Sequence, residues 1–221
     1  MKKYDIFDIM GPIMIGPSSS HTAGAARIGK MAKTIYGKEI KKVTFYLHGS
    51  FQTTYQGHGS DRALVGGVLG YDPDDERLVG SLEDAKEKGI DYMFKTIDLG
   101  YVHPNTIKVL FEDPETGEEF YITGSSIGGG KIEIIDINSI NVRFTGEYPT
   151  IVAEYKDKFG MIAAISLVLT RNNISIASLR VTRDEKIAQM VMELDQTFND
   201  DVIESIKSFP EITRIIGIKP L

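Results

Sequence analysis

Cysteine and tryptophan are both absent from this chain of 221 residues. Without cysteine, the chain has no disulfide framework and no thiolate ligand for a metal ion. Histidine is scarce, and the spacing of the four imidazoles matches no short metal-binding motif, so nothing in the sequence supports a metal site of the chain's own. The four are His21, His48, His58 and His103.

Positive charge is also in short supply, since 25 lysines and arginines are outnumbered by 31 aspartates and glutamates. A surface that binds nucleic acid normally shows as a cluster of basic residues, and no such cluster stands out. We therefore expect no nucleic-acid partner.

Long apolar runs are missing as well. A membrane-spanning helix needs about 18 consecutive apolar residues, and no stretch approaches that length. Near the N-terminus, Asp5, Asp8 and Pro12 interrupt the apolar residues, so the unbroken core of a signal peptide is lacking. These absences favour a soluble, cytoplasmic protein that does not bind a membrane.

The first part of the chain mixes helical and strand patterns. Apolar residues at spacings of three and four predict a helix over 22–36, and alternation predicts a strand over 42–49. Turn residues separate the later segments, so we expect a mixed α+β domain whose end is mostly antiparallel. Further helices are expected at 60–70 and 81–89, and short segments at 90–98, 106–112, 119–126, 131–137 and 140–145.

From residue 148 onward the pattern becomes regular. Strand, helix, strand, strand, helix and strand follow one another at 150–157, 159–173, 174–184, 186–195, 199–209 and 212–221. This βαββαβ order predicts a ferredoxin-like antiparallel sheet with two helices on one face. The fold class is therefore α+β, with a boundary near residue 147 that separates domains 1–147 and 148–221.

One helix start carries more polar side chains than a helix needs. Ser18, Ser19, Ser20, His21 and Thr22 precede the small-residue helix, where unpaired N–H groups and hydroxyls suit a carboxylate or another anion. His21 is also a candidate acid or base. The plain alternative is that Ser20 caps the helix and its neighbours form a loop.

The other histidines lie in turns or at a strand end. His58 lies in a glycine-flanked loop that a ligand can approach, and Asp61 is a candidate to orient its ring. His48 follows a strand, and we favour a local structural role for it. His103 and Asn105 are candidates for substrate binding, with an ordinary turn as the equal alternative. The glycines of 125–131 favour a tight hairpin over a ligand contact.

Four motifs in order resemble the β chain of the iron–sulfur-dependent bacterial L-serine dehydratases. They read "GPIMIGPSSSHTAGAARIGK", "YLHGSFQTTYQGHGSDRALVGG", "VHPNT" and "SIGGGKIEI". The C-terminal stretch "YKDKFGMIAAISLVLTRNNISIASLRVTR" resembles an ACT domain, a small amino-acid-sensing module. Together the two resemblances cover essentially the whole chain.

The resemblance implies an enzyme subunit that converts L-serine to pyruvate and ammonia. It implies a 4Fe–4S cluster whose cysteines belong to a separate α chain, with the active site near the contact between the chains. Ser18 to Thr22 would then hold the carboxylate of serine, and His58 would be a candidate base. The ACT resemblance implies a homodimer with a regulatory ligand near Gly160 and Asn173, although Gly160 also suits a plain turn.

The sequence also leaves a second function open. A chain that ends in an ACT-like domain and lacks the cysteines of the cluster also fits a non-enzymatic, amino-acid-sensing regulatory module. Co-expression with a cysteine-bearing α chain separates the two functions.

Overall fold

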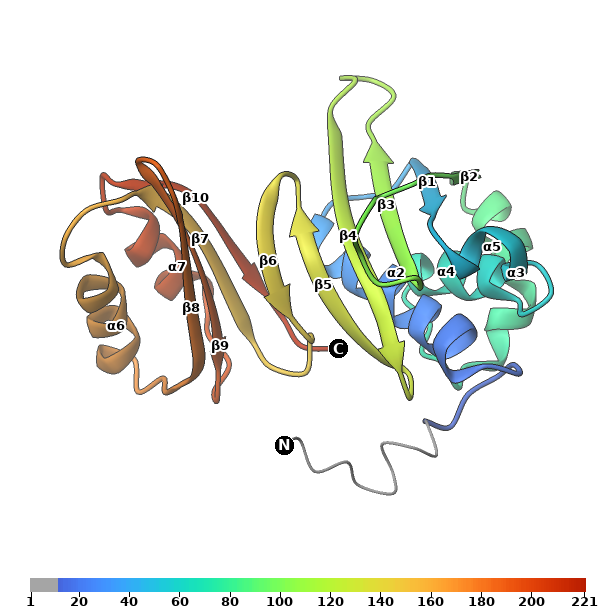
Figure 1. Cartoon of the computed structure of the whole chain (residues 1–221), viewed down its shortest axis with the longest axis horizontal. Helices are drawn as coiled ribbons and strands as arrows, with labels where there is room; N and C mark the ends of the chain where they lie inside the picture. The colour runs from blue at the N-terminus through green and yellow to red at the C-terminus, as the bar shows by residue number, and fades with distance from the viewer. Residues whose placement is uncertain (1–11) are drawn as a thin grey trace. The chain divides into compact units, whose positions relative to one another are not determined.

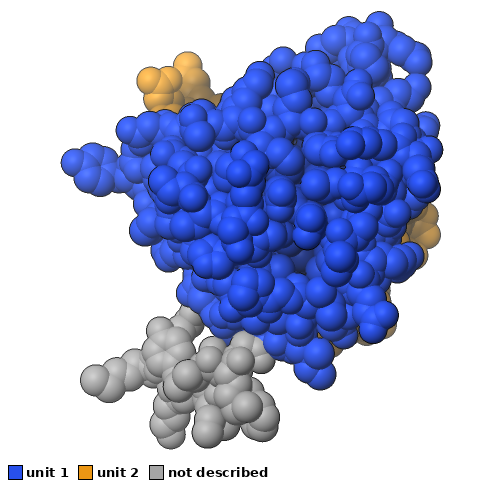
Figure 2. Space-filling model, turned by 90° about the vertical axis from the view of Figure 1, so that its right-hand side faces the viewer, with its two compact units in different colours: residues 1–138 blue, residues 139–221 orange. Residues whose placement is uncertain are grey.

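The computed structural model describes residues 12–221, which form two compact units (Figures 1 and 2). The first unit ends at Asn138 and the second runs from Ser139 to Leu221. Most of the N-terminal segment without a signal-peptide pattern lies outside the described residues. Within 12–221, no helix combines the length and the apolar character needed to cross a membrane.

The first unit combines a sheet with a layer of helices (Figure 1). Its sheet has the strand order β2-β1-β3-β4-β5, in which only β1 and β2 run parallel. Helix α2 lies on β3, β4 and β5, and α4 packs against α2. The elements are η1 (Ser19–Ala23), α2 (Gly24–Tyr36), β1 (Lys42–Leu47), α3 (Ser50–Thr54), α4 (Ser60–Leu69), η2 (Glu76–Gly80), α5 (Ser81–Glu87), β2 (Asp91–Thr96), β3 (Thr106–Glu112), β4 (Glu119–Gly128) and β5 (Lys131–Ile137).

The mixed α+β prediction is therefore confirmed, with differences in detail. The stripe of Ala25, Ile28, Ala32 and Ile35 is buried as the helical pattern requires. The glycine-rich segment before β5 is the predicted hairpin, and its three glycines have positive φ. The short helices α3 and η2 were not predicted, and the first helix begins with a π-helical turn instead of an α-helical one.

Helices α2 and α4 approach each other closely because glycine lies at their contact. A Cβ on Gly67 would lie 2.1 Å from the carbonyl oxygen of Ala26, and a Cβ on Gly29 would lie 2.5 Å from that of Leu64. Contacts this short with backbone atoms leave no room for any side chain. Two of the glycines that weaken the helical pattern at 60–70 and 22–36 are thus explained by packing.

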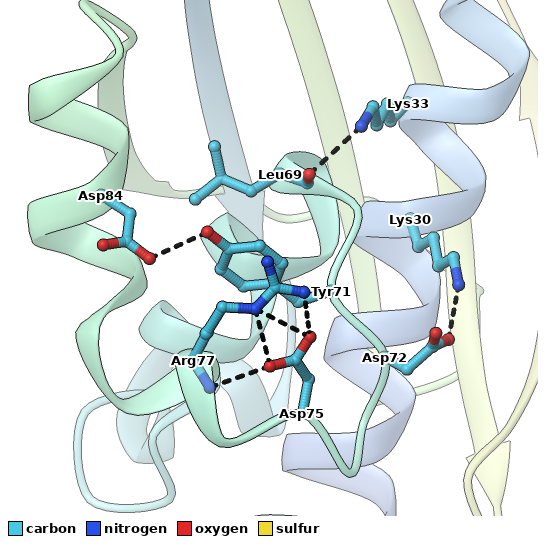
Figure 3. Close-up of polar contacts among 8 residues, drawn as sticks. All are labelled: Lys30, Lys33, Leu69, Tyr71, Asp72, Asp75, Arg77 and Asp84. Atoms are coloured by element: carbon cyan, nitrogen blue, oxygen red, sulfur yellow. Dashed lines mark hydrogen bonds and ion pairs between the residues drawn. The ribbon is translucent and has the colours of Figure 1, made fainter.

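The chain between α4 and α5 is held by polar contacts (Figure 3). Lys33 donates to the carbonyl oxygen of Leu69 at the end of α4, and the hydroxyl of Tyr71 donates to Asp84. The guanidinium of Arg77 lies 4.2 Å from the ring centre of Tyr71 and bonds Asp75. These contacts fix the segment that leads into η2.

The second unit has the expected order of helices and strands. Its four-stranded sheet has the order β10-β7-β9-β8, with every neighbouring pair antiparallel. Helices α6 and α7 lie on one side of it (Figure 1), and their buried residues share one core with β7 and β9. The elements are β6 (Ile140–Phe144), β7 (Thr150–Lys156), α6 (Met161–Arg171), β8 (Ile176–Asp184), β9 (Ile187–Leu194), α7 (Asp200–Lys207) and β10 (Ile212–Ile218).

The ferredoxin-like βαββαβ prediction is therefore confirmed for this unit. The domain ranges 1–147 and 148–221 stay a prediction, and they differ from the two compact units in the place of β6. This strand packs with β9 and falls within the second unit.

The glycine contact between α2 and α4 yields a stability prediction. Gly67→Ala should lower the free energy of unfolding by about 1–3 kcal/mol, because its Cβ would overlap backbone atoms of α2. Gly80→Ala is the control, since no atom lies within 4 Å of the Cβ added there. Urea unfolding of the two variants measures the difference, and equal stabilities would show that the contact tolerates a methyl group.

Candidate functional site

The π-helical turn η1 positions the polar residues that precede α2. Ser18 is its N-cap, and the Ser18 Oγ accepts the backbone N–H of His21 at 3.1 Å. The N–H of Gly24 reaches back five residues to the carbonyl of Ser19. Gly24 has no room for a side chain, because its Cβ would lie 2.1 Å from the Oγ of Ser126. Single π-helical turns of this kind are frequent at functional sites.

Most hydroxyls of this turn make hydrogen bonds within the chain. Ser20 Oγ lies 3.1 Å from Nδ1 of His21, and Thr22 Oγ1 donates to the carbonyl of His58 at 2.9 Å. Ser18 caps the turn, so the plain alternative in which Ser20 is the cap is wrong. Among the described residues, the side chain of Ser19 has no partner. Direct contact of all five residues 18–22 with a carboxylate therefore stays a prediction, best supported for Ser19.

The His21 ring is half-buried and lies against four side chains. Its Nε2 lies 2.8 Å from Ser50 Oγ, and its ring centre lies 4.8 Å from that of Phe51 and 5.0 Å from that of His58. Burial lowers the pKa of His21 below its ordinary value, and the neighbouring His58 lowers it further. Since both ring nitrogens have partners within the chain, the orientation of the His21 ring is fixed.

The His58 ring is placed differently, because it lines a pocket of about 260 Å³. Its Nδ1 is buried, and no described residue forms a hydrogen bond with its ring. Asp61 does not orient it, since Oδ1 of Asp61 accepts the neighbouring N–H of Arg62. The pocket is also lined by Ile15, Gly16, Pro17, Thr22, Gln56, Gly57, Gly59, Arg62, Ala63, Leu78 and Val79.

Two hydrogen bonds hold η1 against the loop that carries His58. Thr22 Oγ1 donates to the carbonyl of His58, and Ser60 Oγ donates to the carbonyl of His21 at 2.6 Å. Ser60 is fully buried, so water does not compete for this bond. The reciprocal pair keeps the two imidazoles side by side.

The remaining predicted residues lie elsewhere in the first unit. Nδ1 of His48 accepts the N–H of Leu99 at 3.1 Å, which is the local role favoured from the sequence. Nδ1 of the exposed His103 accepts the N–H of Asn105, and neither residue lines the pocket. Asn105 is linked to His21 instead, because its Oδ1 accepts a hydrogen bond from Ser50.

A second pocket, of about 650 Å³, lies in the other unit at the start of α6. Gly160 lines it together with Tyr155, Phe159 and Arg183. Asn173 follows the far end of α6, about 16 Å along the helix axis at 1.5 Å per residue. A regulatory ligand that touches both residues of one chain would have to span that length, so the prediction for Gly160 is separable from that for Asn173.

Known proteins resemble this chain along nearly its whole length. A family model described as the serine dehydratase beta chain matches residues 4–88. The chain is 44% identical over 220 residues to the probable L-serine dehydratase, beta chain, of Bacillus subtilis (strain 168), which covers 99% of each chain. It is 45% identical over 216 residues to the L-serine dehydratase, beta chain, of Peptoniphilus asaccharolyticus, covering 96% and 97%.

The chain belongs to the L-serine dehydratase β-chain family. The resemblance carried by the four motifs is thereby confirmed. Among solved structures, the ACT domain from GTP pyrophosphokinase of Chlorobium tepidum is similar over 32% of this chain and 95% of its own length. The identity there is 15% and the TM-score 0.28.

Sequence reasoning missed three residues of this site. Ser50 bonds His21, while Gln56 and Arg62 line the pocket beside His58. All three lie within the second family motif, but polar residues in a motif do not show which of them face one another. Among the described residues that line the pocket, Arg62 is the only lysine or arginine.

The pKa of His21 yields a prediction about acid stability. Because the folded chain holds its pKa below the ordinary value of 6.5, the unfolded chain takes up a proton first as the pH falls. This contribution to the free energy of unfolding is present above 6.5 and is lost as the pH falls through the lowered pKa. Unfolding of the wild type and of His21→Gln, measured from about pH 7 to about pH 5, should show a shallower acid loss in the variant. Parallel curves would contradict a lowered pKa of His21 in the folded chain.

Proposed function

We propose that the chain is the β subunit of an L-serine dehydratase, a lyase that converts L-serine to pyruvate and ammonia together with an α chain. Identity of 44–45% to two β chains over nearly full length supports this assignment. The observation that carries it within the structure is the His58 ring, which lines the pocket with no hydrogen-bond partner among the described residues.

The residues of this chain do not fit a 4Fe–4S cluster. The sequence has no cysteine, and residues 12–221 hold no group of three or more side chains suited to a metal ion. We therefore assign the cluster to the cysteine-bearing α chain, in agreement with the β-chain names of the relatives. The contribution of this chain is then to bind the substrate and to move a proton.

The pocket suits a small amino acid. A volume of about 260 Å³ is large enough for serine. Arg62 supplies a guanidinium, which recognises a carboxylate through paired N–H donors, and no ion pair with a described residue occupies it. We assign the carboxylate of serine to Arg62. Ser19 stays a proposed carboxylate ligand, and it does not line this pocket.

His58 is the base that we assign to the reaction. An imidazole with a free nitrogen accepts the α-proton of serine, and the electron pair of the C–H bond forms the Cα–Cβ double bond. The C–O electron pair leaves with the hydroxyl, for which the cluster of the α chain would supply a Lewis acid. The resulting aminoacrylate takes up water and yields pyruvate and ammonia. Both ring nitrogens of His21 have partners, and its ring packs against the ring of His58. Six further residues stay proposed substrate-binding residues. Of these, Thr22 lines the pocket, and the other five do not: Ser18, Ser20, Asp61, His103 and Asn105.

For the second unit we propose a regulatory role. Strand β8 is an edge strand, and most of its residues are exposed. An exposed edge offers unpaired N–H and C=O groups to a second strand. We propose that two copies of the chain pair through this edge and form a homodimer, with an amino-acid effector bound near Gly160.

The catalytic assignment predicts the result of one substitution. His58→Ala, co-expressed with a cysteine-bearing α chain under anaerobic conditions, should lower kcat for L-serine at least about 100-fold, because the base is removed. His48→Gln is the control, since its ring has a local structural role. Pyruvate release measures the rate.

Two outcomes would contradict the assignment. An unchanged kcat in His58→Ala would remove His58 from the mechanism. A cluster-loaded wild-type complex that produces no pyruvate would overturn the enzymatic function and leave the amino-acid-sensing module.

The proposed homodimer predicts the mass of the isolated full chain. Light scattering at micromolar concentration should give twice 24.5 kDa. Leu179→Glu places a charge on β8, where two copies would face each other, and should give a monomer. Leu167→Glu adds the same charge at a residue of α6 that is 50% exposed and should remain dimeric. A monomeric wild type would contradict the pairing.

A further inference from the structure

His21 stands at the end of a hydrogen-bond chain that leads away from the pocket. Nε2 of His21 lies 2.8 Å from Ser50 Oγ, and Ser50 Oγ donates to Oδ1 of Asn105 at 2.5 Å. These residues are far apart in sequence and come from η1, α3 and the loop before β3. The chemistry assigned above gives Ser50 no role, and Asn105 does not line the pocket.

The backbone around Ser50 is shaped to make this contact. Gly49 has φ of 58°, and a Cβ there would lie 2.3 Å from the carbonyl oxygen of Pro104. The same carbonyl accepts the N–H of Ser50 at 3.0 Å. The close approach that Gly49 permits therefore brings Ser50 beside Asn105.

The direction of each hydrogen bond follows from the groups involved. A carbonyl oxygen only accepts, so the single proton of the Ser50 hydroxyl points to Asn105. Ser50 then has only lone pairs to offer His21, and Nε2 of His21 must carry the proton. This leaves Nδ1 as an acceptor, which agrees with the Ser20 hydroxyl 3.1 Å from it.

We propose that Ser50 and Asn105 are positioning residues that hold His21 as the neutral tautomer with its proton on Nε2. Their effect reaches the reaction through the contact between the His21 and His58 rings, so this inference rests on the proposed function of His58. An uncharged His21 lets His58 gain the α-proton of serine without a second positive charge beside it.

Whether His21 takes up a proton depends on whether residue 105 carries an amide or a carboxylate. An amide at the end of the chain does not stabilise an imidazolium, whereas a carboxylate there would. The titratable group that faces His21 among the described residues is His58, and the neighbours from α3 and the loop before β3 are the uncharged Ser50, Phe51 and Asn105. No described carboxylate competes for His21.

The test is a titration of the full chain labelled with ¹⁵N-histidine and followed by NMR. Only four imidazoles are present, so single His→Gln variants assign every signal. In the wild type, the His21 signals should show a proton on Nε2 and a bare Nδ1 across neutral pH. A protonated Nδ1 on neutral His21 would overturn the proposal.

Four variants, one of them a control, extend the titration. Asn105→Asp keeps the acceptor but adds a charge, and it should raise the pKa of His21 by about one unit or more. Ser50→Ala should give a mixture of His21 tautomers, and Ser50→Thr, which keeps the hydroxyl, should restore one. Asn199→Asp adds the same charge at a helix cap of the second unit and should leave His21 as it is. Asn105→Asp with an unchanged His21 titration, in a chain whose His48 signals show an intact fold, would also overturn the proposal.

These results do not depend on catalysis, so they separate this inference from the proposed function. If the α–β complex is active, Asn105→Asp should lower kcat and shift its pH profile while KM changes little. If the complex is inactive but the His21 signals behave as described, the function fails and the positioning role stands.

Discussion

The site depends on two hydrogen bonds that join η1 to residues 58–60, where the loop with His58 leads into α4. Thr22 bonds the carbonyl of His58, and Ser60 bonds the carbonyl of His21, so each imidazole is tied to the segment that carries the other. The rings lie 5.0 Å apart as a result, although the two residues are distant in sequence. Without these bonds, neither the free face of His58 nor the enclosed ring of His21 would be defined.

The helical layer behind the site supports this arrangement. Glycines at the contact of α2 and α4 bring the starts of both helices within reach of each other, because no side chain separates their backbones. The polar contacts around Tyr71, Asp75 and Arg77 hold the segment that leads to η2, which provides Leu78 and Val79 to the pocket wall (Figure 3). The small pocket is thus a product of close backbone packing.

Much of the fold could be predicted from sequence, because periodicity reports burial directly. The stripe of Ala25, Ile28 and Ala32 marked α2, and the regular order after residue 148 marked the βαββαβ part of the second unit, without β6. The π-helical turn was not predicted, and the close approach of Ser126 to Gly24 beside it joins segments that are distant in sequence. The parallel pairing of β1 with β2 likewise depends on how the intervening helices pack.

The candidate site was predictable only in part. Histidines in polar, glycine-rich motifs drew attention to His21 and His58, and both lie at the site. Their different roles, and the contributions of Ser50 and Arg62, depend on hydrogen bonds between segments that the sequence keeps apart. Asp61 shows that closeness in sequence does not predict a hydrogen bond. Its carboxylate accepts the backbone N–H of Arg62 and does not bond the nearby imidazole of His58.

The central claim is that the chain encloses His21 and presents His58 to the substrate. A crystal structure of the α–β complex with L-alanine, which has no β-hydroxyl to lose, tests it most directly. The account predicts the amino acid against a ring nitrogen of His58, its carboxylate on Arg62, and His21 still bonded to Ser20 and Ser50. L-Alanine bound to His21, or bound away from this pocket, would contradict the account.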